Sequence, residues 1–325
     1  MSARAAPVEV IPAGPRHLLV RLAGQSGRAG WGECSPLPGR SPDSLDACAR
    51  ALAAAARLED VPPSLPAARF ALETALADLE AQARGTSLAA LLSPAPAESL
   101  ACSAVVALDG AAPADPVATW KVKIGRGDLA RELDALRRLR PRVARLRIDV
   151  NRALSRDQAA RLLPLLAELD PEWVEEALSA EDLLALGGAP VPVALDESAA
   201  DQPEATAAAL ERGLVRALVL KPAVLGGLAA CRAWAARARA AGATPVVSHL
   251  FDGPVALAAC AELALALARP GDPAAGLGRH AGLDAFPAAR VPQLSGAALR
   301  PHAPGLGVAL PPPLGGRAAA AQEAR

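Results

Sequence analysis

The sequence predicts an α/β fold in which a closed barrel of parallel strands and helices follows a smaller α+β region. Two observations favour this class. From about residue 101, short apolar strand candidates alternate with Ala-, Leu- and Arg-rich helical stretches, as in parallel β-α-β units. Seven or eight such units over about 180 residues favour a closed barrel over an open doubly wound sheet. No strand candidate precedes a Gly-x-Gly-x-x-Gly motif or a phosphate-binding loop, which counts further against the open sheet.

The N-terminal region has a different pattern. Three strand candidates separated by Gly predict an antiparallel meander over residues 8–11, 17–22 and 30–33. The next stretch, residues 35–42, is too rich in Pro for a helix or a central strand. Two helices are predicted after this loop. One begins near Ser44, and the other covers residues 67–84, where apolar side chains recur at helical spacing.

The elements of the barrel follow from the same patterns. Seven apolar runs are predicted as its strands: residues 102–108, 119–124, 146–150, 172–176, 192–196, 217–221 and 245–248. Helices are predicted between most of them, including residues 129–139, 156–168 and 228–241. Asp128 and Ser155 precede two of these helices and are expected to act as N-caps.

The amino-acid composition indicates which binding partners and which cellular compartment to expect. With 34 Lys plus Arg and 34 Asp plus Glu, the formal net charge is zero, which gives no reason to expect nucleic acid or an anionic membrane as a partner. The five cysteines lie far apart without a Cys-x-x-Cys motif, as expected for reduced thiols. Residues 1–7 lack an apolar signal core, and no uncharged run is long enough to span a bilayer. We expect a cytoplasmic protein and leave open whether it forms a homo-oligomer.

Two lysines close the strand candidate of residues 119–124. Lys121 and Lys123 are two residues apart, so their side chains share one face of an extended strand. Like charges this close lower each other's affinity for protons, and a lysine with a lowered pKa can act as a base. An exposed, solvated Lys-x-Lys is the alternative, and the downstream pattern decides against it.

Charged residues also end the later strands. Five of them lie about 20 to 27 residues apart, one barrel repeat: Lys123, Asp149, Glu175, Asp196 and Lys221. Strand ends at the carboxyl face of a barrel share one mouth, so we expect these side chains to meet. The acids could instead cap helices, but each lies within or at the end of an apolar strand. Three carboxylates repel one another unless a cation lies between them, and oxygen ligands favour Mg²⁺.

Lysines beside a Mg²⁺ site indicate proton abstraction next to a carboxylate, the pattern known from the enolase superfamily. The chain resembles that superfamily over about residues 8–290, in its muconate-lactonizing subgroup and most closely in its o-succinylbenzoate synthase family. Residues 119–123 resemble the subgroup's Lys-x-Lys motif, whose second lysine is the acid/base. Asp149, Glu175 and Asp196 match the positions of the Mg²⁺ ligands, and Lys221 matches the lysine across the barrel.

Further residues favour the synthase family. Residues 30–39 are similar to its active-site loop, and Arg147 matches an arginine found in many synthases. At two positions adjacent acids compete as ligands, and motif position selects Glu175 over Glu176 and Asp196 over Glu197. We expect Arg147, Asn151 and Ser248 to contact substrate, and His249 to be a local structural or rim residue.

The resemblance implies a fold and a reaction. The fold is an α+β cap over residues 1–97, a modified (β/α)7β barrel of TIM type over residues 98–280, and a segment of residues 281–325 that returns to the cap. Its tail from about Gly315 is expected to be frayed. The implied reaction is syn-dehydration of a small carboxylate, 2-succinyl-6-hydroxy-2,4-cyclohexadiene-1-carboxylate, to o-succinylbenzoate in menaquinone biosynthesis. Lys123 would be the acid/base, with Lys121 and Lys221 as supporting cations.

Three other functions compete with this one. An N-acylamino acid racemase or dipeptide epimerase would use the same metal site, but residues 278–284 lack the Asp-x-Asp pair of dipeptide epimerases. A Schiff-base aldolase would need a lysine and no metal. A scaffold protein without catalytic activity would have no use for five charged strand ends, and their burial would cost free energy.

Overall fold

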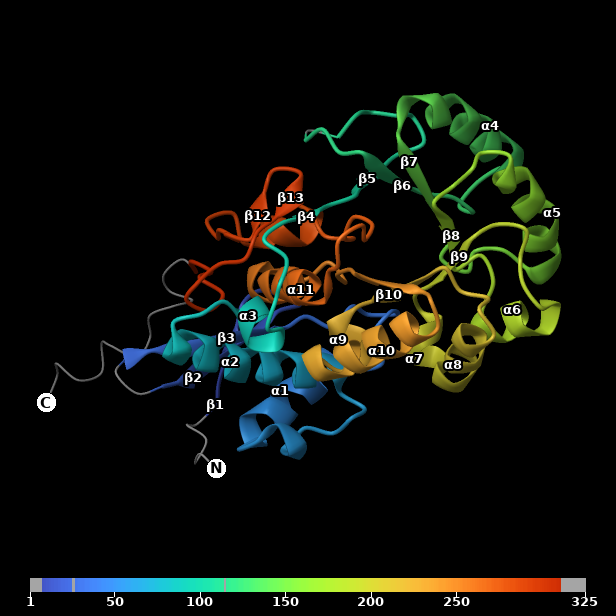
Figure 1. Ribbon diagram of the computed structural model, residues 1–325. Coiled ribbons are helices and arrows are strands. Elements are labelled where there is room, and N and C mark those ends of the chain that lie inside the picture. Colours follow the sequence, from blue (N-terminus) through green and yellow to red (C-terminus); the bar gives the residue numbers. More distant parts are fainter. Residues whose placement is uncertain (1–7, 25–26, 114, 311–325) are drawn as a thin grey trace, which may run out of the picture.

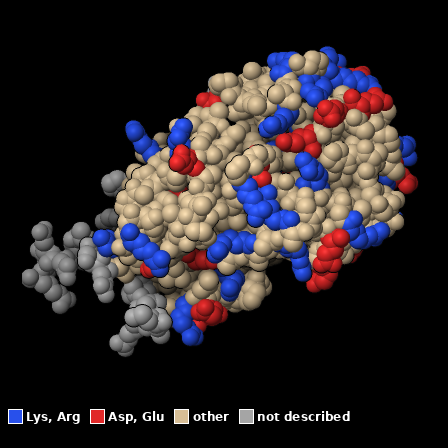
Figure 2. Space-filling view, viewed as in Figure 1, with Lys and Arg blue, Asp and Glu red and all other residues tan. Residues whose placement is uncertain are grey.

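The computed structural model describes residues 8–24, 27–113 and 115–310. Its strands form a three-stranded antiparallel sheet, a seven-stranded parallel sheet and a small sheet of three two-residue strands (Figure 1). The predicted frayed tail from Gly315 lies outside the described residues. Basic and acidic side chains are interspersed over the face shown in Figure 2, in line with the zero net charge.

The N-terminal sheet confirms the predicted meander. It contains β1 (Val8–Pro12), β2 (Leu18–Ala23) and β3 (Ala29–Cys34), in the order β1-β2-β3. Three helices follow: α1 (Leu45–Ala54), α2 (Pro66–Arg84) and α3 (Leu88–Leu92). Helix α2 packs so closely on β3 that a Cβ atom at Gly32 would lie 1.8 Å from the carbonyl oxygen of Ala71. Only glycine fits at this position of the Gly-Trp-Gly-Glu run.

The parallel sheet forms the barrel wall. Its strands are β5 (Ala104–Val106), β6 (Thr119–Lys123), β7 (Arg145–Asp149), β8 (Trp173–Glu175), β9 (Val193–Leu195), β10 (Ala217–Leu220) and β11 (Thr244–Val247). Neighbours in this order are paired, so each predicted strand is confirmed within a few residues. Ala275 bridges Cys102 beside β5 and Gly276 bridges Ser248 after β11, which joins the two edges of the sheet. The predicted TIM-type barrel with an N-terminal α+β region is therefore confirmed.

Helices connect most of the strands. They are α4 (Leu129–Leu139), α5 (Arg156–Ala167), α6 (Ala180–Leu186), α7 (Ser198–Asp201), α8 (Pro203–Glu211), α9 (Pro222–Leu225), α10 (Leu228–Ala240) and α11 (Pro254–Leu267). Short 3₁₀ turns cover Leu58–Asp60, Arg140–Arg142 and Ala281–Ala285. Asp128 caps α4 and Ser155 caps α5, as predicted. Between β5 and β6 the described residues form no helix. None of the described helices is both long and apolar enough to cross a membrane.

Carboxylates of the N-terminal elements join them to the barrel. Glu33 of β3 accepts hydrogen bonds from the backbone N–H groups of Gly253, Val255 and Ala256, at the start of α11. Glu73 of α2 accepts two more from the start of α10. These contacts satisfy helix N-termini that would otherwise lack acceptors.

The C-terminal segment runs back toward the N-terminal elements. Its strands β12 (Leu294–Ser295) and β13 (Ala298–Leu299) pair in a sheet with β4 (Leu100–Ala101). Beyond them, Leu306 donates its N–H to Asp78 of α2. The domain boundaries at residues 97 and 280 stay a prediction.

Candidate active site

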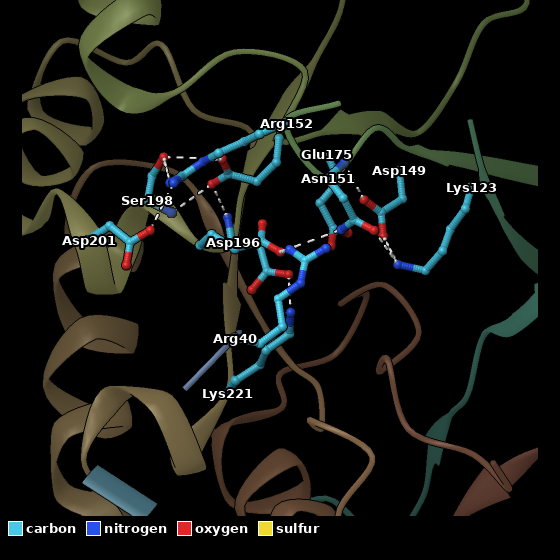
Figure 3. Close-up of polar contacts among 12 residues, drawn as sticks. Arg40, Lys123, Asp149, Asn151, Arg152, Glu175, Asp196, Ser198, Asp201 and Lys221 are labelled. Atoms are coloured by element: carbon cyan, nitrogen blue, oxygen red, sulfur yellow. Dashed lines mark hydrogen bonds and ion pairs between the residues drawn. The ribbon is translucent and has the colours of Figure 1, made fainter. Parts of the chain in front are cut away.

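Charged side chains from adjacent strands meet inside the barrel (Figure 3). Lys121 and Lys123 come from β6, Asp149 from β7 and Glu175 from β8. The Nζ atom of Lys121 lies 2.8 Å from Asp149 Oδ2 and 2.5 Å from Glu175 Oε1. Lys123 Nζ also lies 2.8 Å from Asp149 Oδ2. Residues far apart in sequence thus converge, as their one-repeat spacing predicts.

The cluster contains all three lysines of the 325-residue chain. The third, Lys221, follows β10 and forms a close ion pair with Asp196, which follows β9. The side chain of Lys123 is the most exposed of the three, at 29%, against 14% for Lys121 and 16% for Lys221. Lys123 is therefore the lysine most accessible to a substrate.

The two lysines of β6 do not simply lower each other's proton affinity. Burial alone would lower the pKa of Lys121, but Glu175, Asp149 and Asp196 outweigh burial and raise this pKa above its usual value. The lowered pKa expected for Lys121 is therefore wrong, because the attraction of the three carboxylates outweighs the effect of the Lys123 ammonium. Lys121 is a fixed cation in this arrangement.

The three carboxylates suit a hard divalent cation by their chemistry. All are buried, and their only potential ligand atoms are oxygens, which Mg²⁺ prefers. Burial, with the charges of Asp149 and Asp196, raises the pKa of Glu175 to about 7 even though Lys121 opposes this shift. An added positive charge would relieve that repulsion. In the described part of the chain, however, no three such side chains are arranged to hold one ion as they stand, because the lysine ammoniums lie among them.

Glu175 and Glu176 point to different partners. Glu176 is fully buried and accepts hydrogen bonds from the N–H groups of Asp196 and Ser198, at 2.7 and 2.8 Å. It also forms a 2.8 Å ion pair with Arg152. Its oxygens are thus used within the protein, while Glu175 faces the lysines. This arrangement supports Glu175 as the ligand position.

The second pair of adjacent acids is divided in a similar way. Asp196 is buried beside Lys221, whereas Glu197 bonds to Arg40 at 3.3 Å and to the amide of Asn151 at 3.5 Å. The other oxygen of Glu197 is buried and has no hydrogen-bond partner among the described residues. Asp196 thus belongs to the lysine cluster, and Glu197 to the rim.

The three predicted substrate contacts have different surroundings. Asn151 lines the cavity and accepts a 2.7 Å hydrogen bond from Lys123. Ser248 also lines the cavity, and its hydroxyl donates to the carbonyl of Gly276 at the barrel seam. Arg147 does not line the cavity among the described residues. It is 2% exposed, pairs with Glu172 at 2.6 Å and lies 4.0 Å from the ring centre of Trp173.

A cavity of about 920 Å³ opens above the cluster, with all three lysines in its wall. The Pro-rich loop after β3 contributes Leu37 and Arg40 to this wall, in line with its resemblance to an active-site loop. Arg40 was not among the predicted site residues, and its position in the Pro-rich stretch of residues 35–42, directly after the loop motif, was the available signal. The stacked rings of His249 and His280 also line the cavity.

A family model described as Enolase C-terminal domain-like matches residues 104–313, most of the chain. The chain belongs to the enolase superfamily. Among curated relatives of this superfamily member, the o-succinylbenzoate synthase of Enterobacter sp. (strain 638) is 31% identical, over 74% of this chain and 76% of the relative. The L-Lys-D/L-Arg epimerase of Methylococcus capsulatus is 28% identical, over 77% of this chain and 79% of the relative.

A solved structure of the enolase superfamily shows the same architecture. The dipeptide epimerase from Methylococcus capsulatus, complexed with Mg ion, has a TM-score of 0.75 and 26% identity, over 95% of this chain and all of that one. The predicted resemblance is thus confirmed, and the chain is an enzyme of this superfamily. Relatives named for two different reactions match at similar identity, so membership alone does not select the substrate.

Proposed function

We propose that this chain is an o-succinylbenzoate synthase, which dehydrates 2-succinyl-6-hydroxy-2,4-cyclohexadiene-1-carboxylate in menaquinone biosynthesis. The observation that carries the proposal is the position of Lys123, the most exposed amine of the lysine–carboxylate cluster in the cavity wall. Several relatives with this name, at 31 or 32% identity over about three quarters of the chain, support the choice of reaction.

In this proposal Lys123 acts first as the general base and then as the general acid. Its amine removes the proton from the ring carbon that bears the carboxylate, and the resulting ammonium then protonates the departing hydroxyl. Water leaves, the ring becomes aromatic, and both proton transfers occur on one face, as syn geometry requires. Asn151 accepts a hydrogen bond from the same Nζ and so positions it.

The other charged residues would stabilise the negative charge that builds on the substrate carboxylate. Asp149, Glu175 and Asp196 would hold Mg²⁺, which when bound supplies positive charge beside that carboxylate. Lys121 lies between two of these carboxylates, and its raised pKa keeps it cationic. Lys221 adds a second fixed charge from the other side of the cluster.

Epimerisation of dipeptides or racemisation of N-acylamino acids is the second candidate. The match to an L-Lys-D/L-Arg epimerase favours it, and so does the presence of both Lys123 and Lys221, since such a reaction needs two bases. The missing Asp-x-Asp pair in residues 278–284 counts against dipeptides.

An assay of the purified chain with the cyclohexadiene substrate tests the proposal. We expect aromatisation, seen as a change in ultraviolet absorbance, that stops with a chelator and returns with Mg²⁺. Deuterium exchange at the α-carbon of dipeptides or N-acylamino acids, run in parallel, tests the alternative. Exchange without any aromatisation would select the second candidate.

A further inference from the structure

Two stacked histidines in the cavity wall have no part in the proposed chemistry. His249 lies in the connection between β11 and α11, and His280 begins the Ala281–Ala285 turn. Their ring centres are 3.9 Å apart and their planes differ by 16°. Phe251 meets both rings edge-on, with ring centres 5.9 and 5.8 Å away. The three rings thus form a compact cluster.

Contacts with the backbone hold this cluster in place. Arg16, in the turn before β2, donates a 2.7 Å hydrogen bond to the carbonyl oxygen of Phe251. A Cβ atom at Gly282 would lie 2.4 Å from that same oxygen and 2.8 Å from the His280 ring. The two loops that carry the histidines are therefore packed against each other without spare room.

The backbone also sets the tautomer of each ring. His249 Nδ1 accepts a hydrogen bond from the N–H of Phe251 at 3.0 Å, and His280 Nδ1 accepts one from Gly282 at 3.1 Å. A ring nitrogen that accepts carries no proton, so each neutral ring has its proton on Nε2. Burial lowers the pKa of His249 well below its usual value, and His280 and the lysines lower it further. His249 is thus a neutral N–H donor.

The two Nε2 atoms have different surroundings. His280 Nε2 is sealed off and has no partner in the described part of the chain. His249 Nε2 is not sealed off, and none of the described residues bonds to it, although its ring lines the cavity. The donor open to a ligand is therefore His249, while His280 supports its ring from behind.

The charge of the cavity indicates which acceptor it would take. Seven Lys and Arg side chains line the cavity, against two acidic ones, Asp115 and Glu197. The three lysines among them already pair with the buried carboxylates of the cluster, and Arg40 pairs with Glu197. Arg126, Arg279 and Arg290 remain, and their positive charge favours a ligand with a second carboxylate away from that cluster. Arg279 lies next to His280 in sequence and is in the same wall.

We propose that His249 is a specificity-determining residue whose Nε2–H binds a second carboxylate of the substrate, away from the Asp149–Glu175–Asp196 cluster. This inference rests on the proposed function, whose substrate carries a succinyl carboxylate besides the ring carboxylate. His280 is a positioning residue that holds the imidazole of His249 by stacking.

Ligand binding to the Mg²⁺-loaded protein tests the proposal. The probes are o-succinylbenzoate and its monomethyl ester at the succinyl carboxylate, and calorimetry measures both affinities. We expect the wild type to prefer the diacid at least about tenfold, because the hydrogen bond to a charged acceptor is lost in the ester. His249→Phe keeps a ring for stacking but removes the donor, and should reduce the preference to about twofold or less.

His280→Phe is the matched control, since it makes the same change in the neighbouring ring. It should keep the preference within about threefold of the wild type. Equal loss in both variants, or no preference in the wild type, would overturn the proposal. In the wild type itself, ¹⁵N spectra of the imidazoles give a readout without any variant. The diacid, but not the ester, should shift the Nε2 signal of His249.

The outcomes separate this inference from the proposed function. A preference for the diacid without aromatisation of the cyclohexadiene would reject the function and keep the carboxylate site. Aromatisation without that preference would reject the site alone. Absence of aromatisation together with absence of the preference would reject both.

Discussion

Lys123 differs from the other two lysines by its exposure and by its hydrogen bond to Asn151. We predict that Lys123→Ala lowers kcat at least about a thousandfold, as expected when a general acid–base group is removed. Thermal unfolding should be unchanged, because Asp149 keeps its ion pair with Lys121. Steady-state kinetics and calorimetry measure both effects.

A second substitution separates charge from proton transfer at this residue. Lys123→Arg keeps the positive charge, but a guanidinium holds its proton too tightly to act as a base. It should therefore be as inactive as Lys123→Ala. Dehydration by either variant within tenfold of the wild type would contradict the assigned role.

Asp252 gives a pH dependence of stability. Burial, and then the nearby charge of Glu33, raise its pKa to about 7, far above the usual 3.8. The folded state thus binds this proton more tightly than the unfolded state, so its contribution to stability is lost as pH rises from about 4 through about 7. Asp252→Asn cannot ionise and should remove that loss. At pH 8 it should therefore stabilise the protein by a few kcal/mol, on the order of 1.4 kcal/mol for each unit by which the pKa is raised, and at pH 4 it should have little effect.

Urea unfolding of both proteins at several pH values checks this prediction. Asp170→Asn is the control, because Asp170 is 96% exposed and should leave the pH dependence unchanged. A parallel pH profile for Asp252→Asn and the wild type would show that the buried carboxyl is not responsible.

Among the elements, β8 ends with two glutamates that serve different neighbours. Glu176 joins β8 to the turn after β9, where it accepts the N–H groups of Asp196 and Ser198. Its removal leaves these buried donors unpaired, so Glu176→Ala should lower the free energy of unfolding by about 3 kcal/mol or more. Glu175→Gln keeps a hydrogen-bond acceptor beside Lys121, which stays paired with Asp149, so it should cost less stability than Glu176→Ala and should weaken Mg²⁺ binding.

Urea unfolding and metal titration by calorimetry separate these two effects. The reverse result, in which Glu176→Ala loses Mg²⁺ binding and keeps its stability, would transfer the ligand position to Glu176.

The barrel strands could be predicted from sequence because their signal is local. Each is a short apolar run, and a charged end marks where it reaches the barrel mouth, so β6 to β10 and the convergence of their ends followed directly. The strands β4, β12 and β13 have two residues each and no pattern of their own. Their pairing depends on the return of the C-terminal segment, which only the folded chain determines.

The site was predictable to the same extent. Residues on the strand ends were found, but Arg40 reaches the cavity from a loop whose path no periodicity encodes. Arg147 shares a strand face with Asp149. The sequence pattern alone could not show that the guanidinium of Arg147 contacts Glu172 and Trp173 instead of the cavity. The stacking of His249 on His280 joins two loops and likewise has no local signal.

At the scale of the whole molecule, the N-terminal elements and the barrel are joined by hydrogen bonds between carboxylates and backbone N–H groups. Glu33 and Glu73 complete the first turns of α11 and α10, and Glu262 of α11 accepts the N–H of Ala89 in α3. We predict that both parts unfold in one transition, because unfolding of either part breaks the hydrogen bonds that hold it to the other.

Variants that keep a single tryptophan, Trp31 in β3 or Trp173 in the barrel, report on each part by fluorescence. Their urea midpoints should coincide, and Glu73→Gln should lower both together. An earlier transition at Trp31 alone would show that the N-terminal elements unfold independently.

All three lysines lie at one cavity, so amine-directed covalent reagents should modify the protein selectively at this site. Apart from the terminal amine, the chain offers an acylating reagent no other primary amine. Among the lysines, limited treatment should modify Lys123 first, as the most exposed of the three, and activity should be lost with one added group besides that on the terminal amine. Intact-mass spectrometry can count that group, and bound o-succinylbenzoate should slow its addition.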